Sequence, residues 1–114
     1  MGHYQIEDKV LIVNGNKVSF PYKIDSVKVC NGLYIILLDI PIGITFLNNI
    51  FAADKCGCII WQIQDPKELS IEGNIEYVGI RITEDNKIIA TNFSGITYTI
   101  DPTDGKILNK EITR

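Results

Sequence analysis

The segment from Ile88 to Leu108 constrains the fold more than any other part of the sequence. Over residues 96–101 apolar and polar residues alternate, the period of two that is typical of a half-buried strand. Turn dipeptides interrupt the segment at Ser94-Gly95 and at Asp104-Gly105, and glycine readily adopts the positive φ that tight turns need. The segment therefore predicts an antiparallel meander of three strands joined by two tight turns.

The rest of the chain has the same character. Asn14-Gly15-Asn16 and Asn31-Gly32 each separate two apolar runs, a strong signal for hairpins. The run from Leu33 to Leu38 has no polar face, which predicts the most central strand. We expect an all-β, mostly antiparallel fold of about nine to eleven short strands. The remaining expected strands are 10–13, 17–22, 25–30, 44–47, 50–53, 58–63 and 77–83.

Length and composition indicate one globular domain over residues 1–114. The chain has 114 residues, of which 46% are hydrophobic and 22% charged, enough to bury a core without disulfides. Little helix is expected, and only at residues 66–70, because Asp65, Pro66 and Glu68 form a capping pattern. No apolar run reaches the roughly 18 residues of a membrane span, and the first residues lack a signal-peptide pattern. We therefore expect a cytoplasmic protein that does not bind membranes.

Two stretches of the sequence are alike. Residues 48–61 align with residues 95–109: each has a turn residue, an apolar strand that ends in Asp, a short turn closed by Gly, and a second apolar strand. The equivalent carboxylates are Asp54 and Asp101, and both are expected to accept hydrogen bonds from turn amides, as in Asx-turns. Trp61, at the end of the first copy, is expected to fill the core or the space between sheets. Such repetition is typical of propeller blades and related arrays.

The second copy resembles the repeat of quinoprotein-type (PQQ-like) β-propellers. In that family a Gly precedes a strand that ends in Asp, a Thr-Gly turn follows, and the next strand ends in Trp. Here these positions are Gly95, Asp101 and Asp104-Gly105, and the Trp occurs only in the first copy, as Trp61, with Asn109 in the second. The resemblance implies two blade-like sheets, at about residues 33–64 and 75–114, as a half-propeller or an open two-sheet stack. It carries no quinone or metal ligand onto this sequence.

Catalytic chemistry has little support in the sequence. His3 is the single histidine and has no partner Ser or Cys in a recognisable arrangement, so no catalytic residue is predicted. Cys30 is expected to be a buried thiol, and Cys56-Gly57-Cys58 is one residue short of the usual metal and redox spacing. We therefore predict no metal, no cofactor and no enzymatic activity.

The charge distribution suggests a partner. Residues 58–86 hold six acidic and two basic residues, a net charge of −4, whereas the remainder holds nine basic and eight acidic residues, a net charge of +1. One interpretation is a solvated acidic connection. The other is an acidic surface that steers a basic partner and excludes nucleic acid, whose phosphates need Lys and Arg. The residues predicted to bind that partner are Asp65, Glu68, Glu72, Glu76, Glu84 and Asp85.

Two classes of function fit these features. A short acidic chain without chemistry of its own looks like the bacterial immunity proteins that occlude basic, nuclease-type toxins, and this is the favoured hypothesis. The alternative is a non-catalytic, propeller-like scaffold that self-associates through exposed sheet edges.

Overall fold

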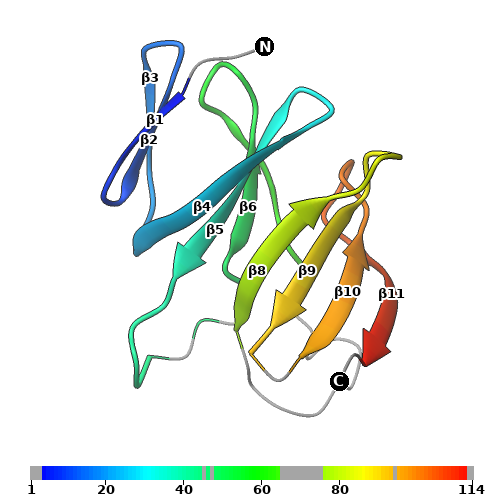
Figure 1. Ribbon diagram of the computed structural model, residues 1–114. Coiled ribbons are helices and arrows are strands. Elements are labelled where there is room, and N and C mark those ends of the chain that lie inside the picture. The colour runs from blue at the N-terminus through cyan, green and yellow to red at the C-terminus, as the bar shows by residue number, and fades with distance from the viewer. Residues whose placement is uncertain (1–3, 45, 47, 65–75, 94, 113–114) are drawn as a thin grey trace.

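A computed structural model describes residues 4–44, 46, 48–64, 76–93 and 95–112. Within these residues the chain forms eleven strands in three antiparallel sheets and no helix (Figure 1), which confirms the all-β prediction. Sheet 1 contains β1 (Tyr4–Glu7), β2 (Val10–Val13) and β3 (Asn16–Ser19). Sheet 2 contains β4 (Lys23–Cys30), β5 (Leu33–Asp39), β6 (Ile50–Ala53) and β7 (Ile59–Gln62). Sheet 3 contains β8 (Tyr77–Ile82), β9 (Ile88–Asn92), β10 (Ile96–Ile100) and β11 (Ile107–Ile112).

Each sheet is a simple meander, because consecutive strands are neighbours throughout. The hairpin turns follow the expected chemistry. Asn14 and Gly15 have φ values of 50° and 82°, and Asn31 and Gly32 have 51° and 78°, so both pairs adopt the left-handed conformation of a type I′ turn. The strand after the first turn ends at Ser19, before Pro21, which cannot donate to a ladder.

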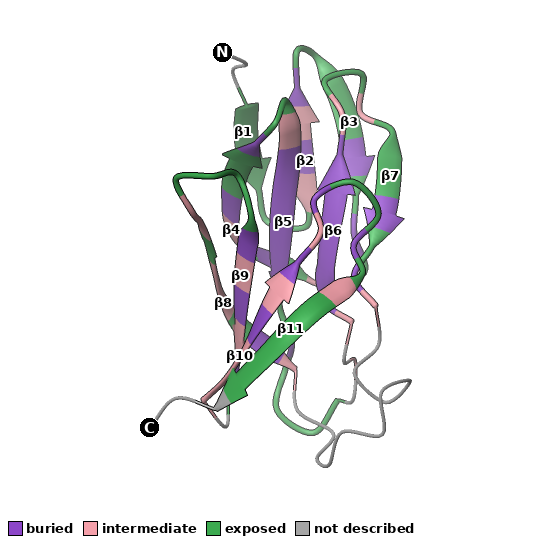
Figure 2. Cartoon of the chain, turned by 90° about the vertical axis from the view of Figure 1, so that its right-hand side faces the viewer, coloured by how far each residue is buried: buried purple, intermediate pink, exposed green. Residues whose placement is uncertain are grey.

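Sheet 2 is the middle layer of the stack and is buried on both faces. Side chains of β5 alternate between two apolar cores: Tyr34, Ile36 and Leu38 join the core shared with sheet 1. Ile35 and Leu37 join the core shared with sheet 3. Figure 2 shows β5 buried along nearly its whole length, whereas β11 at the margin of sheet 3 is mostly exposed. The prediction that residues 33–38 form the most central strand is confirmed.

The structure adds one sheet to the two that the repeat implied. Sheet 1 precedes the expected repeats, and β4 extends sheet 2 upstream of residue 33. The first strand of sheet 1, β1, was not predicted, although Tyr4-Gln5-Ile6-Glu7 alternates apolar and polar residues; all four are exposed, and the run is only four residues long. Ile44 and Phe46 belong to no strand, so the strand expected at 44–47 is absent at those two positions. The helix expected at 66–70 lies outside the described residues.

The two turns that the repeat aligns are closed in the same way. The Asp54 carboxylate accepts hydrogen bonds from the amides of Cys56 and Cys58 at 2.9 and 3.0 Å. The Asp101 carboxylate accepts one from the amide of Thr103 at 2.9 Å. Both carboxylates therefore act as Asx-turn acceptors, as the sequence predicted.

Trp61 joins sheet 2 to the β10–β11 turn of sheet 3. Its side chain is buried, its indole N–H donates to the carbonyl of Pro102 at 2.8 Å, and its ring covers Gly105. The next residues extend the junction, because the Gln64 amide donates to the carbonyl of Gly105 at 3.0 Å. Trp61 is thus the inter-sheet filler that the sequence indicated.

Asn49 makes the second junction between sheets 2 and 3. It is fully buried just before β6, and its Nδ2 donates to the carbonyls of Leu38 at 2.9 Å and Tyr77 at 2.8 Å. Its Oδ1 accepts from the amide of Tyr77 at 3.0 Å. One side chain therefore satisfies backbone groups on two sheets where no ladder could pair them.

The contact between Trp61 and Gly105 can be tested by adding one methyl group. Gly105 has φ +77°, and a Cβ there would lie 2.5 Å from Cε3 of Trp61. Gly32 has nearly the same φ, +78°, with nothing within 4 Å, so it is a matched control. We expect Gly32→Ala to lower the free energy of unfolding by about 1–2 kcal/mol, and Gly105→Ala by about 2–4 kcal/mol. Equal losses in chemical denaturation would show that Trp61 does not pack as described.

Asn49 predicts a pH-dependent effect. Asn49→Ala should lower the free energy of unfolding by about 2–4 kcal/mol, because buried backbone groups lose their partner. In Asn49→Asp, burial would raise the carboxyl pKa above its unfolded value, so the protonated form is favoured in the fold. The Asp variant should therefore resemble wild type more closely at low pH and lose stability as the pH rises. Chemical denaturation of both variants between about pH 4 and pH 7 checks this. If the difference between their free energies of unfolding did not change with pH, the prediction would be contradicted.

Candidate functional site

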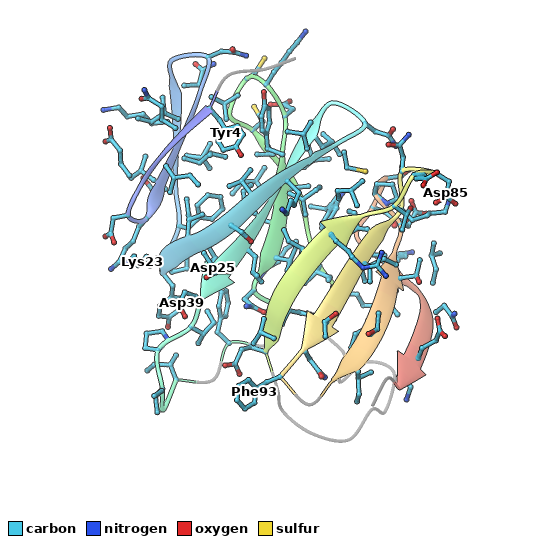
Figure 3. The ribbon with its side chains drawn as sticks, viewed as in Figure 1. Tyr4, Lys23, Asp25, Asp39, Asp85 and Phe93 are labelled. Atoms are coloured by element: carbon cyan, nitrogen blue, oxygen red, sulfur yellow. The ribbon has the colours of Figure 1, made fainter. Side chains whose placement is uncertain are left out.

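A small pocket between sheets 2 and 3 is the best candidate for a binding site. It has a volume of about 110 Å³ and lies between β4, the end of β5 and the start of β8. Three of the lining side chains are carboxylates, and the others are apolar: Asp25, Leu37, Leu38, Asp39, Ile40, Glu76, Tyr77 and Val78. In Figure 3 Asp25 and Asp39 are labelled near each other, in β4 and at the end of β5, and both line the pocket.

Two β-bulges shape the walls. In the β4–β5 ladder Ile24 pairs with Leu38 and Ser26 with Leu37, so Asp25 is the extra residue. In the β8–β9 ladder the register shifts between Tyr77 and Gly79, so Val78 is extra. Bulges redirect side chains and are common beside functional sites. Both extra residues line the pocket, so a β-bulge in each of the two sheets borders it.

Buried hydrogen bonds join the two walls of the pocket. Leu38 on one wall and Tyr77 on the other are the two residues that the side chain of Asn49 joins. The amide of Leu38 also donates to the carbonyl of Asn49 at 3.0 Å. The spacing of the walls is therefore set by buried hydrogen bonds, and a ligand would meet a site that needs little rearrangement.

The lining of the pocket is acidic. Asp25 and Asp39 are exposed and Glu76 is half-buried. Asp25 lies in β4, Asp39 ends β5 and Glu76 precedes β8. Lys23 lies opposite Asp39 in the β4–β5 register, so one lysine shares this end of the molecule with the three carboxylates. The local balance remains negative, because three acidic groups face one base.

The size of the pocket limits what it can hold. Sites for drug-sized ligands enclose roughly 300–1,000 Å³, and this pocket of about 110 Å³ is well below that range. It matches the head group of a single side chain better than a whole metabolite. A second hollow of about 270 Å³ beside β1 and β2 has no charged side chain in its lining, which is Tyr4, Gln5, Ile12, Asn14 and Gly15.

The structure separates residues that the charge pattern had grouped and that the sequence predicted to bind a partner. Glu76 lies at the start of β8 and lines the pocket, whereas Glu84 and Asp85 lie in the turn after β8. The six-residue strand puts about 20 Å between the two groups. In Figure 3 Asp85 is accordingly at the opposite end of sheet 3 from Phe93, which follows β9. The other predicted residues, Asp65, Glu68 and Glu72, lie outside the described residues.

Asp85 has a local structural contact. The hydroxyl of Thr83 donates to its carboxylate at 2.5 Å, and this hydrogen bond is the main cause that lowers the pKa of Asp85. The same hydroxyl accepts from the amide of Lys87 at 2.9 Å, so Asp85 helps to close the β8–β9 turn. Asp25 and Asp39 were missed in the sequence, where they are isolated acids outside the acidic stretch; only folding brings them to Glu76.

The remaining candidate groups do not form a second site. Cys30 is buried, as predicted, and burial raises its thiol pKa. Cys56 and Cys58 are exposed free thiols on the β6–β7 turn. Across the described part of the chain, no group of three or more His, Cys, Asp or Glu is arranged to hold a metal ion. No helix in the same residues is long and apolar enough to cross a membrane.

Comparison with known proteins identifies the fold and the family. No curated protein matches the sequence. Among 28 matching chains of solved structures is the computationally designed Ika8 protein, with a TM-score of 0.62 and 5% identity. The match covers 97% of this chain and 36% of that one, so the chain spans about a third of the designed protein's length. At this identity the likeness concerns the fold alone.

A family model described as "Domain of unknown function (DUF7957)" matches residues 1–112, nearly the whole chain. The protein therefore belongs to the DUF7957 family.

Proposed function

We propose that this chain is a binding protein for a basic protein partner, and that it acts as an immunity-type inhibitor that occludes a basic, nuclease-type toxin. The observation that carries the proposal is the pocket between two sheets that Asp25, Asp39 and Glu76 help to line. A cationic side chain of the partner would enter this pocket and meet three carboxylates. The excess of acidic residues in the chain, which has a net charge of −3, also supports a positively charged partner.

The pocket and the outlying acids would contribute differently. Close charge pairs at protein interfaces have coupling energies of about 1.5–7 kcal/mol, whereas peripheral charges act chiefly on the association rate. Glu84 and Asp85 lie about 20 Å from the pocket along β8. This is roughly twice the Debye length of about 8–10 Å at physiological salt. We therefore assign the affinity to the pocket carboxylates and at most a steering role to the β8–β9 turn.

A propeller-like scaffold that assembles with copies of itself is the second candidate. It is favoured by the two equivalent turns in sheets 2 and 3, in which Asp54 and Asp101 accept hydrogen bonds from turn amides in the same way. The outer face of sheet 3 speaks against stacking on another sheet, because the register places Arg81, Thr91, Thr97, Thr99, Asn109 and Glu111 on it, with Ile89 among them. The outer face of sheet 1 is mixed, with Gln5, Glu7, Lys17 and Ser19 beside Val10 and Ile12. A mostly polar outer face, as on sheet 3, is typical of the terminal units of stacked arrays.

The oligomeric state separates the two candidates. If the chain acts as an inhibitor and does not stack on copies of itself, the purified chain should have the mass of one chain in light scattering at all accessible concentrations. A concentration-dependent increase to a closed oligomer would favour the scaffold over the inhibitor.

The binding proposal can be tested with charge-neutral variants of matched size. The tagged chain is purified from the cells that make it, and the co-purifying protein is identified and assayed with and without the chain. We expect a partner of basic net charge whose nuclease activity is inhibited. The triple variant Asp25→Asn, Asp39→Asn, Glu76→Gln should bind it at least about tenfold more weakly, by about 1.4 kcal/mol.

The double variant Glu84→Gln, Asp85→Asn is the control, because it removes two charges at the far end of β8. It should change the dissociation rate little, and any effect on the association rate should disappear at high salt. A partner that is acidic, or one that binds the triple variant as tightly as wild type, would refute the proposal. A third variant neutralises Asp65, Glu68 and Glu72 and measures the contribution of the acidic stretch that the sequence indicated.

A further inference from the structure

Large apolar side chains are exposed at the same end of the molecule as the carboxylate pocket. Ile42 is 104% exposed, Phe93 is 78% exposed and Ile44 is 45% exposed. Ile42 and Ile44 belong to the loop after β5, and Phe93 begins the β9–β10 turn. In Figures 1 and 2 this loop and this turn both lie at the lower end of the molecule, one extending from sheet 2 and the other from sheet 3.

The local backbone does not require apolar residues at these places. Residues 41–44 form a turn in which the amide of Ile44 donates to the carbonyl of Pro41 at 3.1 Å and Gly43 has φ +89°. This geometry needs a glycine at the third position, but any residue fits where Ile42 lies. The amide of Phe93 donates to the carbonyl of Glu76 at 3.3 Å, which fixes the backbone of Phe93 beside a pocket residue. Its ring contributes nothing to this bond.

Single exposed apolar residues are normal on protein surfaces. Here they come from two sheets: Ile42 and Ile44 follow Ile40, which lines the pocket, and the backbone of Phe93 is hydrogen-bonded to Glu76, which also lines it. Val78, another lining residue, is 45% exposed. Isoleucine and phenylalanine around a charged centre resemble the arrangement at interfaces, where apolar anchors exclude water from a few polar contacts.

We infer that Ile42, Ile44 and Phe93 form an apolar collar around the carboxylate pocket, and that together they bind a protein segment in which a basic side chain is flanked by apolar ones. The inference rests on the proposed function and deepens it, because it specifies the chemistry of the partner. The choice of occupant follows from charge complementarity with Asp25, Asp39 and Glu76. The small volume of the pocket admits one cationic head group and leaves the flanking side chains to the collar.

The collar and the pocket should leave different kinetic signatures. Burial of apolar surface is insensitive to moderate salt and slows dissociation, whereas exposed charges speed association and are screened. Loss of the collar should therefore raise the dissociation rate equally at low and physiological salt.

Short synthetic peptides serve as probes. The first has an arginine flanked by leucines, the second replaces the leucines by serines, and the third replaces the arginine by glutamine and keeps the leucines. Binding is measured by NMR titration of the whole chain, with the signals of Ile42, Val78 and Phe93 as reporters. We expect the first peptide to bind about tenfold more tightly than either of the others.

The collar variant is Ile42→Ala, Phe93→Ala, and its control is Leu108→Ala, a residue on β11 that is 53% exposed. All three side chains are exposed, so the variants should keep the wild-type melting temperature. The collar variant should lose the preference for the first peptide over the second, while the control retains it.

The outcomes distinguish this inference from the proposed function. If the two arginine peptides bind equally well and the collar variant changes nothing, the inference fails, while recognition of a cation by the pocket stands. If the glutamine peptide binds as well as the first peptide, the partner is not basic and both fail. If the arginine peptides bind without shifting the signals of Ile42 or Phe93, the collar is not part of the interface.

Discussion

The fold depends on β5, which, like the shorter β6, buries both of its faces. Residues 34–38 are all buried, and fully burying an Ile or Leu side chain contributes about 1.5–3 kcal/mol. A strand that is apolar on both faces cannot set its own register, because a slip of one residue would exchange equally apolar side chains between the cores. The register must come from its neighbours. The Asn31-Gly32 turn and the half-polar pattern of β4 provide it.

Stacking three sheets creates a difficulty where the chain passes from one to the next. Backbone amides and carbonyls at such crossings are buried but have no ladder partner, and each would cost about 1–3 kcal/mol if left unpaired. Asn49 and Trp61 solve this with side-chain hydrogen bonds to the neighbouring sheet. The same hydrogen bonds fix the candidate site, since the two residues that Asn49 joins, Leu38 and Tyr77, line opposite walls of the pocket.

Acidic residues that are close in the sequence lie far apart in space when an extended strand separates them. The acidic stretch from residue 58 to 86 includes β8, and a strand of six residues carries its two ends about 20 Å apart. Glu76 therefore joins Asp25 and Asp39, which are distant in sequence, and separates from Glu84 and Asp85, which are close in sequence. Charge counted along the chain identified one of the three acidic residues that line the pocket.

The sequence by itself determined the all-β class, the hairpin turns, the central strand and the paired roles of Asp54 and Asp101, because these depend on alternation and on turn chemistry within a few residues. Only the tertiary structure decided which sheets stack, how many there are and where the pocket lies. The alternation in β1 covers only four residues near the start of the chain, and Asn49 looks like one more turn residue. Their roles arise from partners up to 28 residues away, and no local rule describes a contact that only folding creates.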